Sequence, residues 1–350
     1  MHVPRSAVAC AAAVGLLAIL PGTALAKHSH KPKPLGSYAQ RNLVSDQAGK
    51  AEMTDPNLVN AWGLAFGPAT PAWVADNGTG KATLYSGATS PTDPVTIVPR
   101  VFDVSDAPTG QVFNGSSGFM VAGAPALFMF STEAGKITAW QPGLGTTAQT
   151  VASVKNAIFK GLAISGNRIY AADFHHGKVD VWDDSFARVK KRGAFVDRRL
   201  PRKFAPFGIQ AVGNRIVVTY AKQDKKAEDE IDKKGLGFVD VYSRTGRLVK
   251  RLAKRGALNA PWGVVQAPQG FGAASGAMLI GNFGDGRILA FKRNGKKLGE
   301  LAGANRKPLV IDGLWALKFG NGVIGTPTSL LFTSGPDDES HGLFGLLSAM

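Results

Sequence analysis

The feature that most constrains the fold is a strand motif that the chain repeats six times. Each copy starts with a glycine, alternates apolar and other residues, and ends in a large side chain. The copies are GKATLY at 80–85, GKITAW at 135–140, GKVDVW at 177–182, GFVDVY at 237–242, GRILAF at 286–291 and GLFGLL at 342–347. Consecutive glycines of this series are 42 to 60 residues apart. Repeats of that length with strand-like alternation are typical of β-propeller blades.

Each copy follows two other strand-like segments. The nearer one is apolar and ends in a polar residue, as in PAWVAD or RIYAAD. The farther one is led by a second series of glycines: Gly63, Gly118, Gly161, Gly208, Gly263 and Gly313. Helical spacing is not sustained anywhere, and a sandwich or barrel would not explain two glycine series in matching register. We therefore predict an all-β, six-bladed β-propeller in one domain, residues 41–350, with blades near 55–100, 112–150, 155–200, 204–255, 259–305 and 309–350.

The sixth repeat stops after its third strand, at Met350, whereas residues 41–46 precede the first repeat and have no blade of their own. The simplest arrangement lets this N-terminal segment complete the last blade and close the ring, so that no sheet edge stays open. We expect removal of residues 41–46 to destabilise the whole domain.

The N-terminus has the pattern of a secretory signal peptide. Arg5 is followed by an apolar run from 7 to 20 and by Ala24-Leu25-Ala26, which predicts cleavage after Ala26. The only cysteine, Cys10, lies inside this segment, so the mature chain would contain no disulfide. We expect an extracytoplasmic, secreted protein without a membrane span after cleavage. Residues 27–40 are basic and proline-rich and predict a flexible tail.

The mature chain is strongly basic, with 40 basic and 25 acidic residues. Half of the basic residues fall in three segments, 188–203, 244–255 and 292–307. Such a field favours anionic partners, although charged outer strands also keep a propeller soluble. We expect envelope carbohydrate or protein as partners, with an anionic polymer as the candidate for the basic strands. Nucleic acid is not expected, since no nucleic-acid-binding motif is present, and we expect a monomer.

Several motifs resemble known propellers. The glycine-led strands and the VAD ending are similar to NHL-type repeats. NLVSD at 42–46, DPNLVNAWGLAF at 55–66, YAKQD at 220–224, GFVDVYSRTGRL at 237–248, NAPWGVV at 259–265 and HGLFG at 341–345 resemble an uncharacterised family of exported bacterial propeller proteins. This resemblance implies a six-bladed fold and an export route, and it brings no known activity.

The repeats predict which residues lie at the central channel, because loops entering the first strand and loops joining the second and third strands emerge on one face. The residues before the first-strand glycines form one expected ring: Trp62, Ser117, Lys160, Phe207, Trp262 and Asp312. The residues ending the second strands form another: Asp76, Ser131, Asp173, Tyr220, Asn282 and Ser334. With His175, the expected ligand-binding positions are Trp62, Asp76, Lys160, Asp173, His175, Phe207, Tyr220, Trp262, Asn282 and Asp312.

Two kinds of chemistry fit these residues. The aromatic side chains could stack on a sugar or on an aromatic ligand, unless they pack beneath the loops. Alternatively, Asp76, Asp173 and Asn282, helped by Glu133 or Asp285, could bind calcium, and His175, His176 and His341 could ligate zinc. No cofactor is assigned with certainty, and calcium is the metal to look for. Propeller lactonases of the gluconolactonase type carry a glutamate before the first inner strand, where this chain reads Asn60-Ala61-Trp62.

We therefore favour a non-enzymatic binding module on the cell envelope over the alternative, a metal-dependent hydrolase or lyase. Neither a nucleophile elbow, a phosphate loop nor an HExxH motif is present, so no catalytic residue is assigned. The charged segment 222–235 lacks apolar anchors and predicts a mobile insertion, or a lid, on the binding face.

Overall fold

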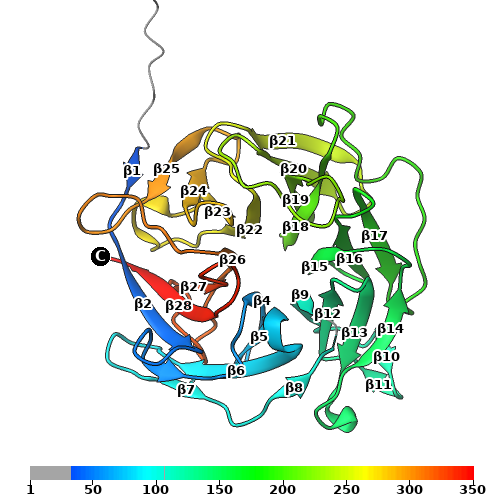
Figure 1. Ribbon diagram of the computed structural model, residues 1–350, viewed down its shortest axis with the longest axis horizontal. Coiled ribbons are helices and arrows are strands. Elements are labelled where there is room, and N and C mark those ends of the chain that lie inside the picture. Colours follow the sequence, from blue (N-terminus) through cyan, green and yellow to red (C-terminus); the bar gives the residue numbers. More distant parts are fainter. Residues whose placement is uncertain (1–32, 106) are drawn as a thin grey trace, which may run out of the picture. The chain divides into compact units, whose positions relative to one another are not determined.

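Six small, mainly antiparallel sheets surround a central axis in the computed structural model, which describes residues 33–105 and 107–350 (Figure 1). The fold is the predicted six-bladed β-propeller. The predicted signal peptide lies outside the described residues. Within them, no helix has the length and apolar character needed to cross a membrane.

The blades follow one another along the chain. Blade one contains β4 (Ala61–Ala65), β5 (Ala72–Asp76), β6 (Lys81–Gly87), β7 (Val95–Ile97) and β8 (Phe102–Asp103). Blade two contains β9 (Pro108–Phe113), β12 (Phe128–Thr132), β13 (Lys136–Trp140) and β14 (Gln149–Ser153). Blade three contains β15 (Phe159–Ile164), β16 (Arg168–Asp173) and β17 (Lys178–Asp183).

The second half repeats the same order. Blade four contains β18 (Phe204–Val212), β19 (Arg215–Lys222), β20 (Gly237–Ser243) and β21 (Leu248–Lys254). Blade five contains β22 (Pro261–Gln266), β23 (Met278–Asn282), β24 (Ile288–Phe291), β25 (Lys297–Leu301) and β1 (Pro34–Leu35). Blade six contains β26 (Leu314–Phe319), β27 (Leu330–Ser334), β28 (Leu343–Ala349), β2 (Tyr38–Ser45) and β3 (Met53–Thr54).

The ring is closed by the N-terminal strand, as predicted. β2 pairs antiparallel with β28, from Tyr38 opposite Ala349 to Ser45 opposite Leu343. In Figure 1 the blue β2 lies beside the red β28. Without β2, the last strand of the chain would present an unpaired edge.

The first-strand glycines mark where neighbouring inner strands approach most closely. A Cβ atom on Gly63 would lie 2.3 Å from the Thr109 carbonyl oxygen, and one on Gly208 would lie 2.2 Å from that of Trp262. Each inner strand also has a register shift at this point, for example between Ala61 and Leu64. At these positions the inner strands approach so closely that little room is left for a side chain, which explains the glycine there.

Side chains alternate between the two neighbouring blades along each strand. In β19, Ile216, Val218 and Tyr220 pack in a cluster with blade three, whereas Val217 packs in a cluster with blade five. Both faces of a blade are therefore buried against neighbours, which is why the second strands are apolar on both faces.

Two expectations need correction. The inner strand of blade two is β9 around Gly110, four residues before the expected start of the blade; Gly118 leads only to a short outlying hairpin of β10 (Met120–Val121) and β11 (Ala124–Pro125). The end of the predicted flexible tail forms β1 and the start of β2. Tyr38 is buried there against Phe271, and its hydroxyl group accepts a hydrogen bond from the Ala274 N–H and donates one to the Phe271 carbonyl oxygen.

Candidate functional site

The innermost ring of side chains is defined by strand register. Trp62 lies one residue beyond Ala61, which pairs with Asp76, and the same position in the other blades is occupied by Thr109, Lys160, Phe207, Trp262 and Trp315. Four of the six expected members are correct. Ser117 is exposed outside the inner strand, and Asp312 is an exposed loop residue before β26, where its Oδ2 atom accepts a hydrogen bond from the Asp337 N–H at 3.0 Å.

The aromatic members of this ring fill the channel rather than line it. The Trp62 and Trp315 rings stack with centroids 3.6 Å apart, and Phe207, Trp262 and Phe283 also contact Trp315. Trp62, Phe207 and Trp262 are at most 2% exposed. Their flat faces are therefore covered by one another, and the expected stacking surface for a sugar is not present at the protein surface.

Lys160 stands over this aromatic cluster. Its ammonium group lies 5.3 Å from the Trp62 ring centroid, 2.6 Å from Glu133 Oε1 and 3.0 Å from Asp229 Oδ1. The lysine side chain is only 4% exposed. Burial by itself would lower the pKa of Lys160, but the carboxylates of Glu133, Glu230 and Asp229 outweigh burial and raise that pKa above its ordinary value.

Asp229 and Glu230 belong to the segment 222–235, which lies over Lys160 and blade three. The Gln223 side chain donates hydrogen bonds to the carbonyl oxygens of Phe174 and His175, and the His175 ring is 3.1 Å from the Ala227 carbonyl oxygen. Although it lacks apolar anchors, the segment is held by polar contacts and by the ion pair with Lys160. It covers the channel mouth on the predicted face.

A network of polar side chains completes the mouth. Asn60 donates to Glu339 Oε2 at 2.5 Å and to Asn77 Oδ1 at 3.1 Å, and it accepts from the Trp315 indole N–H. Asn77 in turn donates to Glu133 Oε2. Burial raises the pKa of Glu339 and, despite the attraction of Lys160, raises that of Glu230 to about 8. Glu230 can therefore exchange a proton near neutral pH. Sequence reasoning missed Glu230 and Glu339, because no repeat marks the loops that carry them.

The second expected ring turns away from the channel. Thr132, not Ser131, occupies the blade-two position, opposite Pro108; Ser131 instead bonds Thr109 and Gly110. Tyr220 donates or accepts a hydrogen bond with the Tyr242 hydroxyl at 2.7 Å, within blade four. Asn282 bonds Asp285, Ala257 and the Asn259 N–H, and so fixes loops of blade five.

The two aspartates of this ring are also separate from one another. Asp76 is fully buried, and burial raises its pKa well above the ordinary value. Asp173 accepts hydrogen bonds from the His176 N–H and contacts the His176 ring at 2.8 Å. Burial raises the pKa of Asp173 as well. Asp173 is therefore held within blade three, whereas both side-chain oxygens of Asp76 are buried without a hydrogen-bond partner among the described residues.

The candidate metal ligands do not converge. Among the described residues, no group of three or more His, Cys, Asp or Glu side chains is placed to hold a metal ion. His341 contacts Asp46 Oδ2 at 2.7 Å and stabilises the closing strand, whereas the rings of His175 and His176 stand nearly perpendicular, at 84°. The histidines and carboxylates named as candidate zinc and calcium ligands therefore form no such group among these residues.

The opposite end of the channel holds a cavity of about 440 Å³, lined by the far ends of all six inner strands. Its lining combines apolar side chains, such as Leu64, Phe66 and Val264, with three glutamines, and Lys318 is the only charged lining residue. The Lys318 ammonium group lies 4.9 Å from the Phe66 ring centroid. The repeat analysis missed this lysine because it lies beyond the glycine-marked positions.

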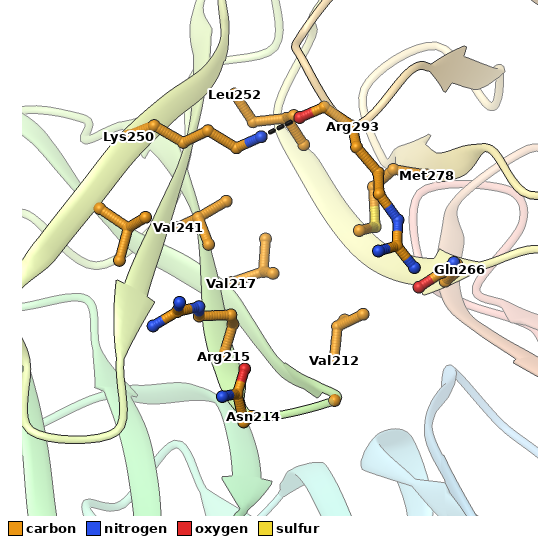
Figure 2. A pocket seen from close by; sticks show the side chains of 12 residues that line it. Val212, Asn214, Arg215, Val217, Val241, Lys250, Leu252, Gln266, Met278 and Arg293 are labelled. Atoms are coloured by element: carbon orange, nitrogen blue, oxygen red, sulfur yellow. Dashed lines mark hydrogen bonds between the residues drawn. The ribbon is translucent and has the colours of Figure 1, made fainter.

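Basic grooves lie between the outer parts of blades three, four and five. We call the first the 3–4 groove; its charged lining residues are Arg168, Lys178, Asp180, Arg188, Lys190, Lys191 and Arg244. The second, the 4–5 groove, is drawn in Figure 2, where Arg215, Lys250 and Arg293 surround the apolar side chains of Val217, Val241, Leu252 and Met278. No carboxylate lines the 4–5 groove.

Fold and site together define a six-bladed propeller with a closed aromatic channel and basic interblade grooves. No family model matches the chain. Uncharacterized protein R648 of Acanthamoeba polyphaga mimivirus is 30% identical over 323 residues, which cover 87% of this chain and 78% of that protein. Uncharacterized protein L690 of the same virus is 28% identical over 334 residues, covering 90% and 87%. The chain belongs to the family of these mimivirus proteins.

Solved structures agree on the fold. A gluconolactonase of Xanthomonas campestris has a TM-score of 0.52 at 12% identity, with 84% of this chain and 87% of that chain covered. Virginiamycin B lyase from Staphylococcus aureus has a TM-score of 0.52 at 10% identity, with 90% and 99% covered. Structural similarity at this level of sequence identity shows only that the propeller architecture is shared.

Proposed function

We propose that this protein is a binding module that holds an anionic polymer, such as an acidic envelope polysaccharide, in its basic interblade grooves. The supporting observation is the unbalanced charge of the grooves. In the 3–4 groove, Asp180 is the single acidic lining residue and already has Arg188 and Lys178 as partners. Arg168, Lys190, Lys191 and Arg244 have no ion-pair partner in the described part of the chain. A repeating anion would supply the missing counter-charges.

The 4–5 groove supports the same ligand class. Arg215 and Arg293 have no carboxylate partner among residues 33–105 and 107–350, and Lys250 donates a hydrogen bond to the Arg293 carbonyl oxygen. Its apolar floor would accommodate the sugar ring faces between acid groups. The predicted signal peptide, with cleavage after Ala26, would place the protein outside the cytoplasm, where such polymers occur.

The test uses the chain from residue 27 to 350 and fluorescent polygalacturonate, with neutral dextran as the reference polymer. We expect binding of the acidic polymer only, weakening steeply between 50 and 300 mM salt as counterions compete. Replacing Lys190 and Arg244 with serine should reduce affinity about fivefold or more at low salt. The matched control removes two exposed charges outside the grooves, with Lys50→Ser and Lys155→Ser. Equal losses in the two variants, or equal binding of dextran, would refute a specific groove.

A second candidate function, acid–base catalysis at the channel mouth, rests on Glu230 with its pKa of about 8 beside Lys160. Such a carboxyl group can donate and recover a proton near neutral pH. The test is hydrolysis of simple lactones, followed by acid release, with the wild type and Glu230→Gln. Turnover that disappears in Glu230→Gln would support this function, and absence of turnover in the wild type would end it for these substrates. Elemental analysis of the same sample tests the metal-dependent alternative.

A further inference from the structure

We infer that the cavity at the far end of the central channel binds a small organic monocarboxylate with an apolar body. This site has no lining residue in common with the 3–4 groove or with the carboxylates at the mouth, and it adjoins the 4–5 groove through Val212, Gly213 and Gln266. It is built from residues at the ends of β4, β9, β15, β18, β22 and β26, which are the inner strands of all six blades. Ala211 and Gly213 at its rim are exposed, so a ligand can enter from this end.

The argument starts from the charge of Lys318. No hydrogen bond or ion pair is made by its ammonium group within the described residues, and the lining contains no carboxylate. Among the described residues, the ammonium group contacts the face of the Phe66 ring. Burial lowers the pKa of Lys318 below its ordinary value. A partly desolvated cation without a counter-ion is an unfavourable arrangement that a bound anion would relieve.

Glutamine side chains supply the remaining polarity. Gln210 and Gln266 line the cavity, and in the described part of the chain their amide groups have no hydrogen-bond partner. Gln111 is fixed by a hydrogen bond from Nε2 to the Trp73 carbonyl oxygen, while its Oε1 atom is buried without a partner. The amide groups of Gln210 and Gln266 and the ammonium group of Lys318 can all donate hydrogen bonds, and the two oxygens of a carboxylate can accept them.

Size and wall chemistry limit the ligand further. One positive charge in a space of about 440 Å³ favours a monoanion over a polyanion. The walls include Leu64, Val112, Val265 and Leu317, so the rest of the ligand should be apolar. Hexanoate is a suitable probe, with hexanol and adipate as its neutral and dianionic counterparts.

The experiment measures binding of the three probes by calorimetry to the wild type, Lys318→Met, Lys318→Arg and the exposed control Lys155→Met. We expect hexanoate to bind the wild type and Lys155→Met equally, Lys318→Arg within a few-fold, and Lys318→Met about tenfold more weakly or worse. Hexanol and adipate should bind more weakly than hexanoate. Lys318→Met removes an uncompensated charge and should melt no lower than the wild type, so loss of binding would not reflect unfolding.

Three results would overturn the inference: no hexanoate binding to the wild type at millimolar concentration, equal hexanoate binding by Lys318→Met, or equal binding of hexanol. Because Lys190 and Arg244 lie in the 3–4 groove and not in this cavity, their serine variants should bind hexanoate normally. Failure of polymer binding and failure of carboxylate binding are therefore distinguishable.

Discussion

Trp62 and Trp315 stack face to face, with ring centroids 3.6 Å apart and planes 14° from parallel. Trp62 belongs to the first blade and Trp315 to the last, so the stack joins the two ends of the ring at the channel. The Trp315 indole N–H donates to Asn60, whose side chain also holds Glu339. This contact couples ring closure to the order of the channel mouth.

We expect Trp315→Ala to lower the free energy of unfolding by about 3–5 kcal/mol, because the buried ring fills the channel between Trp62, Trp262 and Phe283. Trp315→Phe keeps an aromatic ring and loses the bond to Asn60, so its cost should be smaller. Urea denaturation measures both. A Trp315→Ala variant within 1 kcal/mol of the wild type would show that the stack does not hold the ring together.

The glycine at the inner-strand bulge gives a second prediction. A methyl group on Gly208 would lie 2.2 Å from the Trp262 carbonyl oxygen, whereas one on Gly303 would have no atom closer than 3.5 Å. Gly208→Ala should therefore destabilise the protein by about 1–3 kcal/mol through overpacking. Gly303→Ala should leave the melting temperature nearly unchanged. If both variants melt alike, the close approach of the inner strands does not constrain position 208.

The repeats predicted the fold because the strands pack in the same way from blade to blade and most blades have a glycine at the inner-strand bulge. Errors arose where a blade departs from that pattern. In blade six, Ala316 stands at the bulge that is glycine in the other blades, so Gly313 was taken in its place and Asp312 was placed on the channel. In blade two, an added hairpin brings Gly118 nearer to the second strand than the true inner-strand Gly110.

The site was harder to predict because it depends on side-chain direction. Asp173 ends β16 as expected, whereas β19 continues past Tyr220 to Lys222, and the side chains of both residues bond to groups of their own blades. The burial of Trp62 depends on Trp315, which is more than 250 residues away in the sequence. Lys318 stands out only because every other lining residue of its cavity is uncharged, and the sequence alone does not show which residues share a cavity.

The raised pKa of Glu230 predicts how stability changes with pH. Burial raises this pKa from its ordinary value to about 8, so between about pH 4.5 and 8 the folded protein binds a proton that the unfolded chain has released. The contribution of Glu230 to stability should therefore fall as pH rises through this window.

Glu230→Gln resembles the protonated form and should match the wild type near pH 5, yet be more stable by about 2 kcal/mol near pH 9. Glu228→Gln, on the exposed side of the same segment, is the control and should show no such pH-dependent gain. Thermal melts of the three proteins from pH 5 to 9 measure the difference. Parallel curves for the wild type and Glu230→Gln would contradict the prediction. They would mean that Glu230 is ionised throughout this range and that Lys160 fully compensates its carboxylate.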